Sequence, residues 1–158
     1  MGYHTDFEGR FNLDRPLDFA THRLLTGLAT TRRLARNVGP EYGVEGEFYI
    51  DGTGMLGQGM DPTIIDHNTP PRTQPGLWCQ WTPTEDNQGL EWDGGEKFYD
   101  CVEWLQYLLD KVLIPNGYVL NGVVKWDGEE QGDVGEIHVA DNVVTTRTGR
   151  LVFEEASR

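Results

Sequence analysis

Apolar residues between Phe98 and Val112 recur every three or four positions, and this spacing constrains the fold more than any other feature. The residues of this set are Phe98, Cys101, Val102, Leu105, Leu108, Leu109 and Val112. Residues spaced in this way share one side of an α-helix, and charged residues such as Lys97 and Asp110 fall on the other side. The pattern predicts an amphipathic helix over about residues 96–113, which must bury its apolar side against a second layer.

The segments on either side of this helix alternate apolar and polar residues with the period of two that β-strands have. Strands are predicted at residues 3–13, 46–51, 76–83, 88–93, 118–126, 134–140 and 143–148. Another helix is predicted at 18–36, where Asp18 is a suitable N-cap and leucines and alanines follow at helical spacing. The order β-α-β-β-β-α-β-β-β indicates an α+β fold, a mainly antiparallel sheet of about five to seven strands packed by two helices.

A chain of 158 residues is expected to form one domain, here residues 1–153, with a frayed tail at 154–158. The longest irregular stretch lies between the predicted strands at 46–51 and 76–83. It holds four glycines between Asp51 and Pro62 and three prolines between Asn68 and Pro75. Long loops in compact domains are usually functional. Residues 52–75 are therefore a candidate for a partner-binding loop.

The net charge of −13 is unevenly distributed along the chain. Residues 1–36 carry a charge of +2, whereas residues 37–158 carry −15. A negative field of this size repels nucleic acid and anionic membranes, and it favours a basic protein partner or serves solubility. Because the sequence has neither an apolar run of about 18 residues nor a signal-peptide core, we expect a cytoplasmic protein.

The sequence lacks the motifs of the common catalytic and cofactor sites. Its only serine is Ser157, there is no HExxH pair, and neither phosphate-binding glycine motif is present. Cys79 and Cys101 are expected to be reduced, buried thiols. No catalytic residue, metal site or cofactor is therefore predicted.

Acidic residues crowd the predicted turn that follows Trp126. Asp127, Glu129 and Glu130 begin this group. Carboxylates can bind a hard cation or a basic partner, although their spacing does not fit the EF-hand loop. The alternative is a solvated hairpin whose charges discourage unwanted strand pairing.

Two further groups are candidates for binding. Trp78, Glu91, Trp92 and Asp93 place carboxylates beside aromatic rings, as in sugar-cleaving enzymes, or else the tryptophans pack in the core and the acids face solvent. Asp66 and His67 form a possible base and its orienting partner, or else they cap turns. The arginines of TTRRLAR bind phosphate or an acidic partner, or form internal salt bridges.

Six sequence blocks stand out along the chain: GYHTDFEGRFNLDRPL, TTRRLAR, QPGLWCQW, EWDGGEKFYDCVEWLQYL, GYVLNGVVKWDGEE and GEIHVADNVV, which together span about residues 2–145. These blocks resemble an uncharacterised family of small proteins from actinobacteria and their phages. The resemblance implies an accessory role in a phage or mobile element. It supplies no catalytic residues.

Three functions remain open from the sequence. The first is a phage-type accessory protein that binds a host or phage macromolecule, such as a defence or DNA-binding protein, through an acidic surface. The second is a small-ligand-binding protein or hydrolase with a tryptophan-lined acidic pocket. The third is a structural or assembly subunit.

Overall fold

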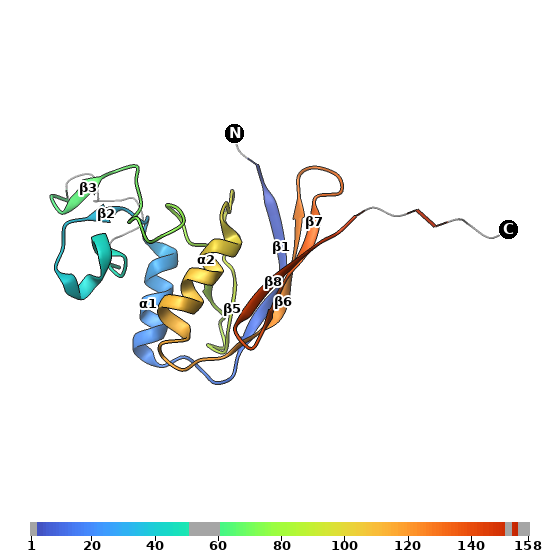
Figure 1. Cartoon of the computed structure of the whole chain (residues 1–158), viewed down its shortest axis with the longest axis horizontal. Helices are drawn as coiled ribbons and strands as arrows, with labels where there is room; N and C mark the ends of the chain where they lie inside the picture. Colours follow the sequence, from blue (N-terminus) through green and yellow to red (C-terminus); the bar gives the residue numbers. More distant parts are fainter. Residues whose placement is uncertain (1–2, 51–60, 151–152, 155–158) are drawn as a thin grey trace.

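The computed structural model of the chain describes residues 3–50, 61–150 and 153–154, and it has the predicted α+β architecture. A six-stranded sheet with the order β4-β5-β1-β6-β7-β8 forms one layer, and every neighbouring pair in it is antiparallel. Its strands are β1 (Thr5–Leu13), β4 (Trp81–Pro83), β5 (Gly89–Trp92), β6 (Leu120–Gly128), β7 (Val134–Ala140) and β8 (Val143–Thr148). Figure 1 shows the two helices together on one side of this sheet.

The helical layer contains α1 (Phe19–Thr30) and α2 (Cys101–Leu108), and a π-helical turn, η4 (Leu109–Leu113), continues α2. A second, two-stranded sheet pairs β2 (Ala35–Arg36) with β3 (Ile64–Asp66). The short 3-10 turns η1 (Pro40–Tyr42) and η2 (Val44–Gly46) lie between these two strands in the chain. In Figure 1 this small sheet lies beyond the helices, on the side away from β6, β7 and β8.

The core forms where the apolar sides of the helices meet one face of the sheet. Phe11, Val124 and Ile137 contribute from the sheet, and Leu105 and Leu108 contribute from α2; all five are fully buried. The predicted apolar spacing of the helical segment is therefore confirmed. Burial of large apolar side chains is the main favourable term in folding, so this layer holds the sheet and the helices together.

Both helices are shorter than predicted. The first begins as expected, with the Asp18 carboxylate accepting a hydrogen bond of 2.7 Å from the Thr21 N–H, but it ends at Thr30 instead of residue 36. The second begins at Cys101 instead of residue 96, because Lys97 and Asp100 have positive φ angles of 59° and 58°. These turns let Phe98 pack against the Trp81 ring, with 5.3 Å between the ring centroids.

Residues 31–36, the end of the predicted first helix, are not helical, because the Arg33 side chain is buried in the interior. Its guanidinium donates to the carbonyl oxygens of Tyr49 at 2.8 Å and Glu47 at 2.9 Å, and to Gln74 Oε1 at 3.2 Å. The pKa of Arg33 falls to about 10 because the side chain is buried. Its neighbour Arg36 forms the expected kind of internal salt bridge, 2.6 Å from Asp61.

The strand predictions are accurate in the last third of the chain and incomplete in the middle. The strands at 134–140 and 143–148 have the predicted bounds, and Asp141 and Asn142 form the predicted two-residue turn with φ angles of 46° and 69°. The strand predicted at 46–51 is wrong, because η2 and a turn occupy its described part. The strand predicted at 76–83 is reduced to Trp81–Pro83, and the short β2–β3 pair was not predicted. Residues 52–60 of the predicted loop, and 155–158 of the predicted tail, lie outside the described residues.

Candidate functional site

The face of the main sheet opposite the helices, which we call the open face, carries a row of charged side chains across four strands. The register places Glu8 opposite Lys125, Lys125 opposite Glu136, and Glu136 opposite Arg147. Alternation within residues 3–13 places Asp6, Glu8 and Arg10 on one side of this strand, but the sequence does not show which strands lie beside it. Opposite charges on neighbouring strands stabilise a sheet modestly, so this row is compatible with the fold.

The next row toward the start of β1 has a different charge pattern. Asp6 lies directly opposite Asp127, and both side chains are exposed. Directly opposed residues on antiparallel strands have Cβ atoms about 5 Å apart, and like charges at that position destabilise the sheet. His4 Nε2 lies 2.8 Å from Asp6 Oδ1 and provides Asp6 with one local partner. The register therefore places two like charges opposite each other at this position.

A hollow of about 620 Å³ lies over these two rows. It is lined by residues of β1, β6, β7 and β8 and by Gly149, which follows β8. Its charged lining residues are Asp6, Glu8, Lys125, Asp127, Glu136 and Arg147. The four carboxylates outnumber the two cations, so the hollow is net acidic and open to a partner. His138 Nε2 lies 2.9 Å from Glu136 Oε1, and this contact lowers the pKa of Glu136.

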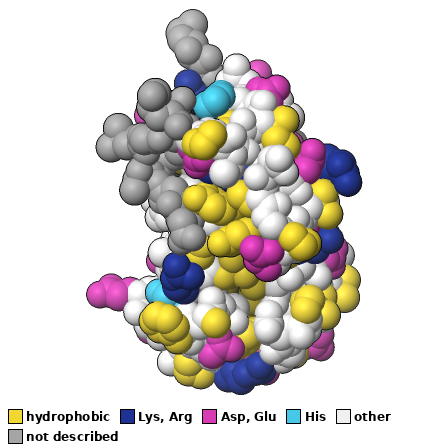
Figure 2. Space-filling model, turned by 90° about the vertical axis from the view of Figure 1, so that its left-hand side faces the viewer, with side chains coloured by type: hydrophobic (Ala, Val, Ile, Leu, Met, Phe, Trp, Pro, Cys, Tyr) yellow, Lys and Arg dark blue, Asp and Glu magenta, His cyan; other side chains and the backbone are white. Residues whose placement is uncertain are grey.

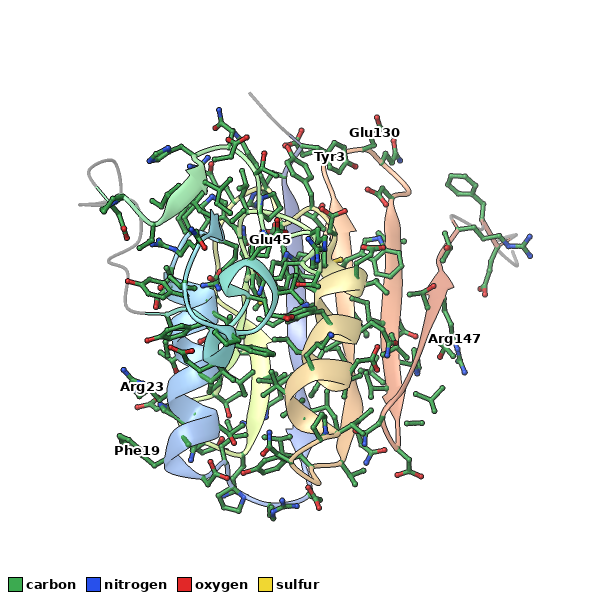
Figure 3. The ribbon with its side chains drawn as sticks, turned by 60° about the vertical axis from the view of Figure 1, so that its left-hand side comes forward. Tyr3, Phe19, Arg23, Glu45, Glu130 and Arg147 are labelled. Carbon is green, nitrogen blue, oxygen red and sulfur yellow. The ribbon has the colours of Figure 1, made fainter. Side chains whose placement is uncertain are left out.

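The acidic turn between β6 and β7 is tied to the beginning of the described chain (Figure 3). The Tyr3 hydroxyl donates to Asp133 at 2.5 Å and accepts from the Glu130 N–H at 3.0 Å. The bond to Asp133 raises the pKa of the Tyr3 phenol. Glu129 accepts from the His4 N–H, and Asp133 also accepts from the Trp126 indole. Glu129 and Asp133 therefore have structural partners.

Of the three hairpin acids predicted as binding residues, Asp127 alone lines the hollow. Glu129 is committed to the His4 backbone, and the side chain of Glu130 is exposed at the tip of the turn. Within the described residues, no group of three or more histidine, cysteine or acidic side chains is arranged to hold a metal ion. The open face therefore concentrates carboxylates from three different strands rather than from one loop.

Glu91 and Trp92 point to opposite faces of β5. Glu91 lies on the open face, beside the hollow formed by Arg10 and Asp86. Trp92 packs on the core side, 5.4 Å from the Phe7 ring, and its indole donates to Gln80 at 3.1 Å. Asp93 accepts a hydrogen bond from the Gly95 N–H, and partial burial raises its pKa. The structure therefore does not bring Glu91, Trp92 and Asp93 together in one pocket.

The remaining tryptophans are divided between core and surface. Trp81 and Trp104 are fully buried, Trp126 is half-buried, and Trp78 is 38% exposed in the segment before β4. Trp78 and Trp81 therefore differ in exposure, one partly exposed and the other buried. Core packing accounts for Trp81 and Trp104, and none of the described hollows is lined by more than one tryptophan.

Asp66 is the last residue of β3 and His67 begins the exposed turn that follows it; β3 lies beyond the helices, on the side away from β6, β7 and β8 (Figure 1). The Asp66 carboxylate accepts from the Asn68 N–H at 2.8 Å and from the Thr69 hydroxyl at 3.0 Å. These bonds lower the pKa of Asp66. The His67 carbonyl accepts a hydrogen bond from Arg32. The Asp66 carboxylate therefore caps its own turn, whereas the bond given for His67 involves its backbone alone.

In comparisons with models of known protein families, with curated proteins and with solved structures, nothing matched this chain. No helix of the described residues is long and apolar enough to cross a membrane. Inferences about function therefore rest on the geometry of the chain itself.

A second hollow, of about 380 Å³, separates α1 from η1. Phe19, Leu24, Tyr42 and Phe48 give it an apolar lining, and Phe19 is 83% exposed. Figure 2 shows the side of the molecule away from the outer strands, where hydrophobic side chains gather near the centre. None of the nine binding candidates from the sequence lines this hollow.

Arg10 and Asp86 form an ion pair on the open face, next to Glu91. Two guanidinium nitrogens donate to the two carboxylate oxygens at 3.0 and 3.2 Å. The hydrogen bonds from Arg10, then those from Thr84 and the Gln88 N–H, lower the pKa of Asp86 from 3.8 to about 2. Because the pKa is lower in the folded state, the stabilisation is present above pH 3.8 and is lost as the pH falls toward 2.

We therefore expect Asp86→Asn to be less stable than the native chain at neutral pH, with the difference shrinking between pH 4 and about pH 2. Urea unfolding followed by circular dichroism across this range measures the difference. A stability difference that stays constant down to about pH 2 would show that this carboxylate is not held ionised by Arg10.

Proposed function

We propose that this chain is a non-enzymatic binding protein that engages a basic segment of a macromolecular partner over the open face. The observation that carries the proposal is the opposed Asp6–Asp127 pair, which lies in the hollow with Glu8 and Glu136. A lysine or arginine side chain placed between two opposed carboxylates relieves their repulsion and gains charge-assisted hydrogen bonds.

The charge distribution supports a basic partner. Residues 37–158 carry a net charge of −15, so a positively charged surface is attracted from a distance and docks at a higher rate. The same charge disfavours direct contact with nucleic acid. In this proposal the partner belongs to a host or phage, and a DNA-binding or defence protein has the basic surface that the open face would fit.

Two observations favour binding over the alternative of a small-ligand site or hydrolase. The carboxylate of Asp66 faces its own turn, and Glu91 is separated from the Trp92 ring by the sheet. Asp6, Glu8 and Asp127 are exposed and Glu136 is only partly buried, so none of them lies in the kind of apolar site that keeps one acid protonated beside an ionised one in acid–base catalysis. A charged hollow that is open to solvent and spans four strands suits a basic segment of a macromolecular partner.

A capture experiment tests the proposal. The tagged chain is exposed to actinobacterial lysate at low salt, alongside the variant Asp6→Asn/Asp127→Asn and the control Glu103→Gln/Asp110→Asn. The control removes the same number of charges from exposed positions in α2 and η4. We expect basic proteins to be recovered by the native chain and the control and lost with the open-face variant. Equal recovery by all three would contradict the proposal.

The same open-face variant makes a further prediction about stability. Because this variant removes a like-charge pair, we expect its free energy of unfolding to be no lower than that of the native chain, and up to a few tenths of a kcal/mol higher. Urea unfolding measures this. A clear loss of stability would mean that the two carboxylates serve the fold, which would remove the main argument for a binding role.

A further inference from the structure

We propose that two copies of this chain associate through the outer edge of β8, forming an antiparallel β8–β8 pair that joins their sheets. The two edges of the main sheet differ in a way that points to this. The edge strand β4 has only three residues and contains Pro83, which has no N–H to donate. Short strands and proline are the usual protection against unwanted pairing. The edge strand β8 has six residues, VVTTRT, and neither proline nor lysine.

The outer edge of β8 presents unpaired backbone groups. The Gly149 N–H donates to the Val134 carbonyl at 2.8 Å. With the register of the two strands, this bond shows which residues of β8 direct their backbone N–H and C=O groups toward β7. Backbone groups in an antiparallel pair alternate in direction. Those of Val144, Thr146 and Thr148 therefore point away from the sheet, and no described strand pairs with them. Figure 3 shows β8 on the outside of the sheet, with Arg147 projecting from it.

The sequence of β8 is self-complementary in one register. If the two-fold axis passes through Thr146, each Val144 lies opposite Thr148 of the partner subunit, and all three outward residues form hydrogen-bonded pairs. Arg147 then lies opposite Thr145 of the partner subunit. Threonine and valine make favourable cross-strand pairs. The register centred on Arg147 would instead oppose two like charges, so the side chains select the first.

Charge complementarity argues for a second copy rather than an unrelated strand. Asp141 precedes β8 and Arg150 follows it, and both side chains are exposed. In the register centred on Thr146, Arg150 comes opposite Asn142 of the partner subunit, one residue away from Asp141 of the partner subunit, and the two-fold axis repeats this arrangement. A second copy of the chain has the same strand and the same flanking charges, so an acidic and a basic residue come near each other at both ends of the paired strands. The inference is independent of the proposed basic partner, because it uses none of the carboxylates in the hollow.

Light scattering coupled to size-exclusion chromatography at physiological ionic strength tests the inference. We expect the native chain to approach twice its mass of 17.9 kDa as its concentration rises through the micromolar range. Thr146→Pro removes an outward N–H without breaking a bond to β7, and Thr146→Lys keeps this N–H but places two like charges at the axis. Both variants are expected to remain monomeric, with native circular dichroism.

The control is Thr82→Lys, the same kind of substitution on the opposite edge strand, which is expected to leave the dimer intact. If Thr146→Pro fails to fold, Thr146→Lys decides the question alone. A native chain that stays monomeric at the highest concentration, a Thr146→Lys variant that dimerises normally, or a Thr82→Lys variant that is monomeric would each overturn the inference.

Discussion

Replacing Arg33 with methionine is expected to lower the free energy of unfolding by about 3–5 kcal/mol. Methionine fills similar space but leaves the carbonyl oxygens of Tyr49 and Glu47, and Gln74 Oε1, without the donor that now satisfies them. Gln74 also donates to the Glu47 carbonyl at 2.6 Å and to the Tyr107 hydroxyl at 3.1 Å. The loss therefore spreads through a network that joins residues 46–49 and Gln74 to α2.

Arg32→Met is the matched control, because it changes the neighbouring arginine in the same way. Arg32 donates to the His67 carbonyl at the surface, and exposed interactions of this kind contribute less than about 1 kcal/mol. Urea unfolding of both variants, followed by circular dichroism, gives the comparison. Similar losses for Arg32 and Arg33 would mean that the buried network does not hold this part of the chain.

Trp81→Ala is expected to cost about 3–5 kcal/mol, the range for removing a fully buried large aromatic side chain. The Trp81 ring meets three phenylalanine rings edge-on, with centroids 5.3 to 5.7 Å away, and its indole donates to the Cys101 carbonyl at 2.8 Å. The residue therefore joins β4 to β1 and to the first turn of α2. Its loss would open a cavity and leave the Cys101 carbonyl without this donor.

The control for this experiment is Trp78→Ala, three residues earlier in the chain. Trp78 is partly exposed, and its loss is expected to cost less than about 1.5 kcal/mol. Thermal and urea unfolding of the two variants measure the difference. If Trp78→Ala were the more damaging change, the assignment of Trp81 to the core and Trp78 to the surface would be wrong.

The elements that the sequence predicted well are those whose signal is local. Strands β7 and β8 alternate regularly and are joined by Asp141-Asn142, a turn that determines its own geometry. The apolar side of α2 was predicted residue by residue, although its first turn was not. The start of that helix depends on Phe98 reaching Trp81, a contact that no local pattern records.

The features that were missed depend on contacts distant in sequence. Helix α1 ends early because the acceptors for Arg33 come from residues 46–49 and from Gln74. The Asp6–Asp127 pair depends on the register between β1 and β6, which lie more than 100 residues apart. Alternation had placed Asp6 and Glu8 on one side of a strand, and the charge of the chain had indicated an acidic surface. The three-dimensional structure was needed to show which acidic side chains lie next to one another on that surface.

The most direct measurement of the central claim is a fluorescence anisotropy titration of a labelled peptide rich in lysine and arginine. The native chain, Asp6→Asn/Asp127→Asn and Glu103→Gln/Asp110→Asn are titrated at low salt. The last two have equal net charge, so only the position of the missing carboxylates differs between them. If the open face is the binding site, the first variant weakens binding by about ten-fold, equivalent to about 1.4 kcal/mol, and the second by less than about two-fold. Equal weakening by both variants would mean that the peptide responds to total charge alone, and would contradict a binding site on the open face.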